Sequence, residues 1–68
     1  MFEYRKNVLY IYNLNKIIEV NENYISVSSS KNMIIDIKGS SLLVSSFDDK
    51  EISIIGRIDN ISITTINV

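Results

Sequence analysis

The chain has 68 residues and a formal net charge of −1 at pH 7, and it contains neither cysteine nor histidine. A chain of this length forms one domain with a marginal core, so residues 1–68 are expected to be a single domain. Small domains usually gain stability from disulfides, a metal or association. Disulfides are excluded here and a zinc site is disfavoured, which leaves association. Acidic and basic residues are mixed without a basic stripe, which argues against a nucleic-acid partner.

The N-terminal residues 1–6 do not lead into the apolar run of a secretory signal, so none is expected. No apolar stretch reaches the roughly 18 residues that a membrane-spanning helix needs. The absence of cysteine is consistent with a reducing compartment.

Apolar and polar residues alternate along most of the chain, which is the pattern of half-buried β-strands. In chain order, the expected strands are 8–13, 16–20, 25–28, 33–38, 42–47, 51–57 and 61–65. Turn-forming residues separate several of them, at 21–23, 29–32 and 48–50. Ile and Val dominate the apolar residues and alanine is absent, which favours strands over helices. The sequence therefore predicts an all-β domain of six or seven short antiparallel strands in a meander, arranged as a curled sheet, a β-roll or a small sandwich.

The alternation breaks where apolar residues follow one another directly. These places are Ile17-Ile18, Ile34-Ile35, Leu42-Leu43-Val44 and Ile54-Ile55. Both faces of a strand are apolar there, whereas an antiparallel sheet with one solvent-exposed face would have polar residues on that face. Two explanations remain open: the sheet curls so that both faces are covered, or a second subunit buries one face.

The two glycines occupy equivalent places in a repeated pattern, I-x-I-x-G. The pattern occurs once as 35–39, ending at Gly39, and once as 52–56, ending at Gly56. Glycine at the end of a strand suits a tight turn or a bulge, because it adopts positive φ without strain. We therefore expect a strand to end at each glycine.

Residues that could carry catalysis are nearly absent. Without His or Cys, the usual general base and the thiol nucleophile are missing, and no serine lies in a G-x-S-x-G motif. Asp48, Asp49 and Glu51 are the densest acidic group, but they lack the spacing of a calcium loop and indicate a solvated hairpin turn. We expect no enzyme activity, no catalytic, cofactor-binding or metal-binding residues, no cofactor and no small-molecule substrate.

Aromatic residues cluster near the N-terminus. Tyr4, Tyr10 and Tyr12 lie close in sequence to Arg5 and Lys6, a combination that could stack the bases of a single-stranded nucleic acid. Two cations are a weak electrostatic footprint for such a ligand. Cross-strand packing is the favoured interpretation of these tyrosines.

The surroundings of both glycines match a known family. Residues 37–42 read I-x-G-x-x-L, residues 54–61 read I-x-G-x-I-x-x-I, and two short strands precede them at 16–20 and 24–27. In this order and spacing, residues 13–63 resemble the YabP/YqfC family of small sporulation proteins from endospore-forming bacteria. The matching signature positions are Ile37, Gly39, Leu42, Ile54, Gly56, Ile58 and Ile61.

The chain departs from the family pattern in two places. Asn32 stands where a glycine is usual, and Ile63 stands where an aromatic residue is usual. Asn is the residue that best replaces glycine in the left-handed region of backbone conformation, so the turn is expected to survive.

The resemblance implies a protein made in the mother cell during sporulation. It implies a cytoplasmic location on the mother-cell side of the developing spore, a role in assembling the spore envelope, and a membrane-protein partner. It supplies no catalytic residues.

Two functional hypotheses follow. The first is a non-enzymatic assembly or scaffold protein that forms a homo-oligomer through sheet edges or an apolar face, because edge strands without proline are poorly protected against pairing. The alternative is a monomeric binding module that recognises a peptide by strand addition or a glycan through its tyrosines.

Overall fold

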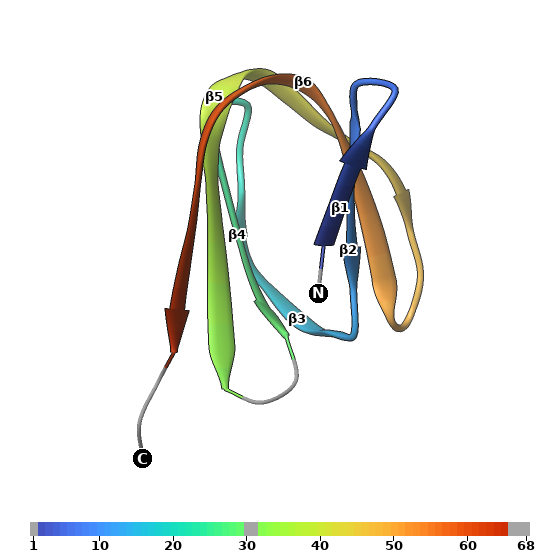
Figure 1. The fold of residues 1–68 in the computed structure, drawn as a ribbon, viewed down its shortest axis with the longest axis vertical. Helices are drawn as coiled ribbons and strands as arrows, with labels where there is room; N and C mark the ends of the chain where they lie inside the picture. The colour runs from blue at the N-terminus through green and yellow to red at the C-terminus, as the bar shows by residue number, and fades with distance from the viewer. Residues whose placement is uncertain (1, 30–31, 66–68) are drawn as a thin grey trace.

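The computed structural model describes residues 2–29 and 32–65, which form one sheet of six antiparallel strands. The strands are β1 (Phe2–Arg5), β2 (Val8–Tyr12), β3 (Leu14–Val20), β4 (Tyr24–Ser29), β5 (Met33–Phe47) and β6 (Glu51–Thr65). Their order across the sheet is β1-β2-β6-β5-β4-β3, so β3 to β6 form a meander and the β1–β2 hairpin is attached along β6 (Figure 1). The predicted all-β antiparallel fold is confirmed. Among the described residues, no helix is long and apolar enough to cross a bilayer.

The sheet folds over because β5 and β6, each 15 residues long, bend together near their middle. Residues 33–38 of β5 pair with 60–65 of β6 and with β4, whereas residues 43–47 pair with 52–55, beside β2. Two layers result (Figure 1). We call them the β2 layer (β1, β2, the first half of β6 and the second half of β5) and the β4 layer (β3, β4, the first half of β5 and the second half of β6).

The hydrophobic core lies between the two layers. The largest fully buried side chains come equally from the β2 layer (Leu9, Ile11, Ile52 and Ile54) and from the β4 layer (Ile25, Val27, Ile35 and Ile37). Each occupies the inner position of an alternating strand, as the period of two requires. Full burial of a side chain of this size stabilises a fold by about 1.5–3 kcal/mol.

The strand ends expected at the glycines are wrong. The two predicted strands on either side of Gly39 are one strand, β5, and the two on either side of Gly56 are one strand, β6. The pairing between β5 and β6 shifts register between Lys38 and Gly39, between Ser40 and Leu43, and again between Val44 and Ser46. Bulges of this kind bend a strand sharply without ending it.

Glycine is required at the bend because two backbones come into close contact there. A Cβ atom at Gly39 would overlap the carbonyl oxygen of Arg57, and one at Gly56 would overlap the carbonyl oxygen of Ser41. Gly56 also has a φ of +122°, which L-residues rarely adopt, and Ser41 opposite it has a φ of 54°. Both glycines therefore lie at a register shift and at a close backbone contact, and the expected positive φ occurs at Gly56 but not at Gly39.

The expected turn at 21–23 forms and supports the bend, whereas residues 30–31 of the expected turn at 29–32 lie outside the described residues. The side-chain oxygen of Asn21 accepts a hydrogen bond of 2.9 Å from the Asn23 amide. The backbone carbonyl of Asn23 then accepts a bond from the Gly39 amide, and that of Glu22 accepts one from the Leu42 amide, at 3.1 and 2.8 Å. Asn32 adopts a φ of 60°, the left-handed conformation expected where the family pattern has glycine.

Strand β1 is absent from the sequence-based prediction. It pairs with β2 through a two-residue turn, in which Lys6 and Asn7 have φ values of 51° and 65°. Two positive φ values are the mark of a type I′ turn, which matches the twist of a hairpin. Asparagine is common in such turns but lysine is not, so residues 6–7 do not predict the turn. The alternation of Phe2 and Tyr4 with charged residues was the available sequence signal for β1.

The geometry of the bend predicts different effects on stability for substitutions at two facing positions, Gly56 and Ser41. Gly56→Ala should lower the free energy of unfolding by at least about 1–3 kcal/mol, because alanine is strained at this φ and meets the Ser41 backbone. Ser41→Gly should stay within about 1 kcal/mol of the wild type, because it relieves a left-handed residue. Urea unfolding measures both. Equal stability of wild type and Gly56→Ala would contradict this role of the bend.

Candidate interaction surfaces

Folding of the sheet covers only one face of each layer. In every doubled apolar position, one residue packs against the core and its neighbour stays at least partly exposed. The pairs, core member first, are Ile17/Ile18, Ile35/Ile34, Leu42/Leu43 and Ile54/Ile55. The curl therefore does not cover both faces, and the first of the two explanations is wrong.

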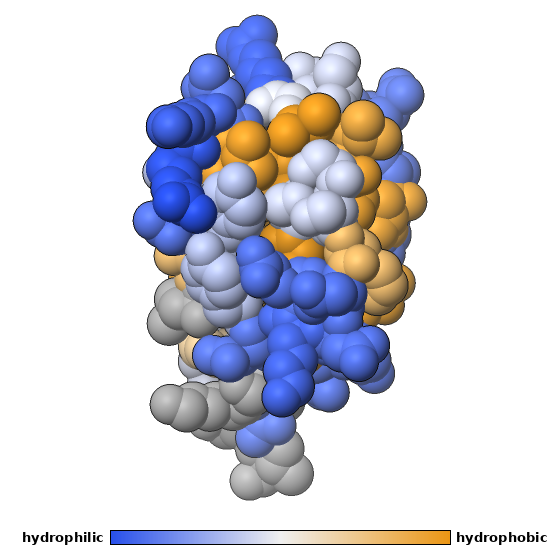
Figure 2. Space-filling model, turned by 90° about the vertical axis from the view of Figure 1, so that its right-hand side faces the viewer, coloured by the Kyte–Doolittle hydropathy of each residue, from blue (hydrophilic) through white to orange (hydrophobic). Residues whose placement is uncertain are grey.

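Three of the outward apolar side chains form a row across the β2 layer. Val8 pairs with Ile55 and Ile55 pairs with Leu43, so the three lie on one face of adjacent strands. Leu43, at the free edge, is 58% exposed, and the other two are half-buried. We call these residues the apolar row. Figure 2, which views the molecule from the side of the β2 layer, shows a hydrophobic area bordered by polar residues.

Two tyrosines extend this face beyond the apolar row. The rings of Tyr10 and Tyr12 are stacked, with centroids 6.5 Å apart and planes 8° from parallel. The Arg5 guanidinium lies 4.9 Å from the centroid of the Tyr10 ring, and the Tyr12 hydroxyl donates a hydrogen bond of 3.1 Å to Glu3. The structure thus brings together part of the aromatic group noted in the sequence.

Tyr4 and Lys6 do not join that group. Tyr4 pairs with the buried Leu9, so its side chain lies on the inner face of the layer, and Lys6 occupies the turn. A stacking platform of three tyrosines and two cations is therefore not formed. The Tyr10–Tyr12 stack lies along one strand, β2, and the cross-strand packing expected of these tyrosines is their contact with Arg5 and Glu3 of β1.

The outer face of the β4 layer carries a group of hydrogen-bonded polar side chains beside the outward Ile18 and Ile34. The Asp36 carboxylate accepts hydrogen bonds of 2.7 Å from both the Tyr24 hydroxyl and the Ser26 hydroxyl. Ser28, on the same face, has a buried hydroxyl for which no hydrogen-bond partner is present among the described residues. The two outer faces of the molecule therefore differ in composition. The β2 layer carries the apolar row, whereas on the β4 layer hydroxyls and charges accompany the outward Ile18 and Ile34.

Two tyrosine hydroxyls on these faces have a raised pKa. The hydrogen bond donated to Asp36 raises the pKa of Tyr24 above its ordinary 10.0. Partial burial, followed by the bond to Glu3, raises the pKa of Tyr12. In both cases the folded chain favours the neutral phenol.

The raised pKa of Tyr24 predicts a loss of folding stability at alkaline pH. The contribution of Tyr24 is fully present below the unfolded pKa, near 10.0, and disappears as pH rises through the higher folded value. The stability difference between wild type and Tyr24→Phe should therefore be constant at neutral pH and shrink above about pH 10. Denaturant unfolding across this range measures it, with Asp36→Asn as a control that should lower the Tyr24 pKa. A difference that grows with pH would contradict the assignment.

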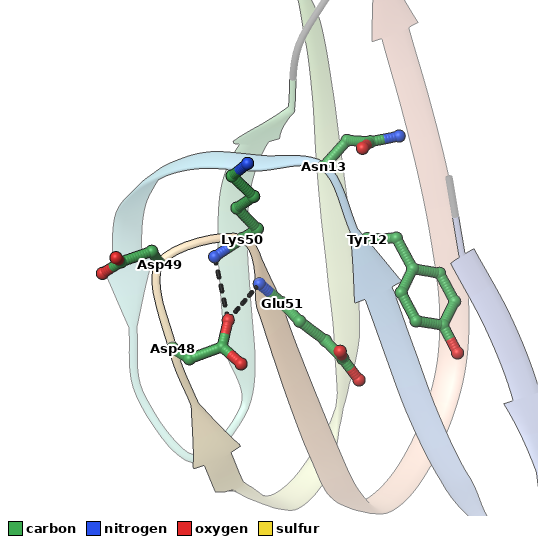
Figure 3. Close-up of a pocket in the computed structure, with 6 residues that line it drawn as sticks. All are labelled: Tyr12, Asn13, Asp48, Asp49, Lys50 and Glu51. Carbon is green, nitrogen blue, oxygen red and sulfur yellow. Dashed lines mark hydrogen bonds between the residues drawn. The ribbon is translucent and has the colours of Figure 1, made fainter.

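The acidic group at residues 48–51 is a hairpin turn, as expected. The Asp48 carboxylate accepts bonds of 2.9 Å from the amides of Lys50 and Glu51 (Figure 3). An open depression of about 550 Å³ lies beside the turn, and Tyr12 and Asn13 complete its lining. The side chains of Asp49 and Glu51 point in different directions (Figure 3). The described residues contain no cluster of three acidic, His or Cys side chains able to hold a metal.

A second depression opens where the two layers part. It has a volume of about 340 Å³ and lies between Tyr4 of β1 and residues 58–61 of β6. Tyr4 is 51% exposed although it faces inward. The inner face of the sheet is therefore exposed to solvent at this depression, beyond the buried core.

The family-signature positions surround the bend. Ile37, Leu42 and Ile54 are buried in the core, Gly39 and Gly56 form the backbone contact, and Ile58 and Ile61 pack against the core from the second half of β6. Sequence reasoning thus selected positions that shape the fold. It missed Tyr4 and Leu43 as exposed surface residues, because alternation alone does not show how far the opposite layer extends.

No protein-family model matches the chain, and no curated protein matches it. The resemblance to the YabP/YqfC family stays a hypothesis that rests on the two glycine motifs.

Proposed function

We propose that this chain is a non-enzymatic assembly protein that binds further copies of itself through the exposed outer face of the β2 layer. The observation that carries the proposal is the apolar row, with Leu43 58% exposed at its end. Contiguous exposed apolar surface bordered by polar residues is typical of protein–protein interfaces. The neighbouring Arg5 and the two stacked tyrosines are residue types enriched in such interfaces.

The size of the chain supports association. A domain of 68 residues has a marginal core, and this one has neither disulfides nor a His or Cys metal site to add stability. Burial of the exposed part of Leu43 would contribute on the order of 1 kcal/mol per copy. Binding of a second copy would therefore add the burial of apolar surface that stabilises a small domain.

The process is proposed from the family resemblance. The match of residues 13–63 to the YabP/YqfC pattern supports a role in spore-envelope assembly on the mother-cell side of the developing spore. A membrane-protein partner belongs to the same proposal, and the outer face of the β2 layer is the surface offered to it.

Leu43→Lys tests the association directly. Light scattering behind size exclusion, over a roughly hundredfold concentration range, should give a wild-type mass above that of one chain that rises with concentration. The variant should dissociate at least about tenfold more readily, because a lysine would be buried in the interface. Asn15→Lys, at an exposed strand position outside the row, is the matched control and should behave as the wild type. A monomeric wild type throughout would contradict self-association.

The same pair of variants tests the cellular part of the proposal. A fluorescent fusion of the wild type, expressed in the mother cell of a sporulating bacterium, should collect at the forespore surface. The Leu43→Lys fusion should be diffuse and the Asn15→Lys fusion should localise. Diffuse fluorescence of all three would contradict a role in the spore envelope.

A monomeric glycan-binding module is the second candidate, and the parallel stack of Tyr10 and Tyr12 favours it. Aromatic rings exposed on a sheet provide flat apolar contact area with polar hydroxyls at the rim. The two candidates differ in mass, because a module of this kind stays monomeric at every concentration.

A further inference from the structure

Among the described residues, the bent sheet has four strand edges without a strand partner, and three of these edges are protected against pairing. β1 is only four residues long and carries Glu3 and Arg5. β3 has two register shifts and carries Lys16 and Glu19. The second half of β5 has a register shift between Val44 and Ser46. Short length, charge and bulges are the devices by which natural sheets prevent edge-to-edge association.

The fourth edge has none of these devices. Residues 60–65 of β6 contain no charged residue and no proline. They pair with residues 33–38 of β5 without any register shift, so this part of the strand is straight. Its other side has no strand partner among the described residues. Figure 1 shows this half of β6 at the outside of the β4 layer.

The exposed part of the inner face lies along this same edge. Ile61 and Ile63 pair with the buried Ile37 and Ile35, so their side chains are on the inner face, yet Ile63 is 44% exposed. The depression lined by Tyr4 and residues 58–61 continues this apolar surface to β1. A strand added to β6 would therefore gain main-chain hydrogen bonds and cover inner apolar side chains together.

We propose that residues 60–65 of β6 pair antiparallel with the same residues of a second copy, about a two-fold axis at Ser62. This proposal rests on the proposed function, self-association, and names a second contact through which it occurs. It continues the β4 layer from one copy into the other. The open depressions of the two copies then lie on the same side of the joined sheet.

The register follows from the positions of the two isoleucines. With Ser62 opposite itself, Ile61 lies opposite Ile63 of the second copy, and both inner pairs are apolar. A register centred on Ile61 would place Asp59 opposite Ile63, and one centred on Ile63 would place Ile61 opposite Thr65. Of these three registers, only the one centred on Ser62 places Ile61 of each copy opposite Ile63 of the other.

We infer that a second copy pairs with this edge, because two copies of the edge meet without bringing like charges together. The nearest charged residues, Arg57 and Asp59, form an ion pair with each other at 3.2 Å and lie outside the paired segment. In the two-fold arrangement the two Asp59 side chains lie at opposite ends of the joint, so like charges do not meet. An edge selected for a charged peptide would carry complementary charges within residues 60–65, and it carries none.

Charge substitution at the two-fold axis gives one test. Ser62→Lys and Ser62→Asp each place two like charges opposite each other in the pair, whereas Ser62 is exposed in the single chain. Each variant alone should dimerise at least about tenfold more weakly than the wild type, and an equimolar mixture of the two should recover the pairing. Two variants that each pair as tightly as the wild type would overturn the proposal.

Cross-linking tests the register, because the chain has no native cysteine. Under mild oxidation, Ser62→Cys should form a covalent dimer at least about tenfold faster than Asn60→Cys, since only residue 62 faces itself within disulfide distance. A mixture of Asn60→Cys with Thr64→Cys should form the mixed dimer. Absence of the Ser62→Cys dimer, or equal rates for Ser62→Cys and Asn60→Cys, would overturn this pairing. If the wild type still oligomerises and Leu43→Lys still weakens it, the proposed function survives that failure.

Discussion

The whole structure depends on the close contact of two backbones at the bend of the β5–β6 hairpin. Gly39 lies against Arg57, and Gly56 lies against Ser41, at distances that admit no side chain. Because this contact lets both long strands turn without ending, one continuous sheet supplies both layers of the core. The described part of the fold therefore buries its eight fully buried large side chains without a helix or a second sheet.

The same bend determines which surfaces stay open. A single sheet folded once buries its inner face, but it leaves two outer faces and an unclosed side between β1 and the second half of β6. The described residues contain no further strand or helix that covers them. The apolar row and the straight edge of β6 lie on different layers, so the two contacts that we propose are distinct. Two distinct contacts on one protomer would extend an assembly beyond a closed dimer.

Alternation in the sequence predicted strand segments within β2 to β6, because a period of two assigns inner residues such as Ile35 and Ile37 without further information, but it left β1 unpredicted. It was not sufficient at Gly39 and Gly56, because a glycine that ends a strand and a glycine that bends one have the same local pattern. The exposure of Leu43 and Tyr4 was also hidden from sequence reasoning. Their burial depends on how far the facing layer extends, which is a property of the folded sheet.

Concentration-dependent hydrogen exchange tests most directly whether the open surfaces bind a second copy. Amide exchange is measured by mass spectrometry on dilute and concentrated wild-type protein. Amides of residues 60–65 in β6 should exchange more slowly at high concentration, because pairing satisfies N–H groups that are free in the single chain. Amides of buried β4 should not change, since their hydrogen bonds are made within one chain. Identical exchange of residues 60–65 at both concentrations would contradict assembly through this edge.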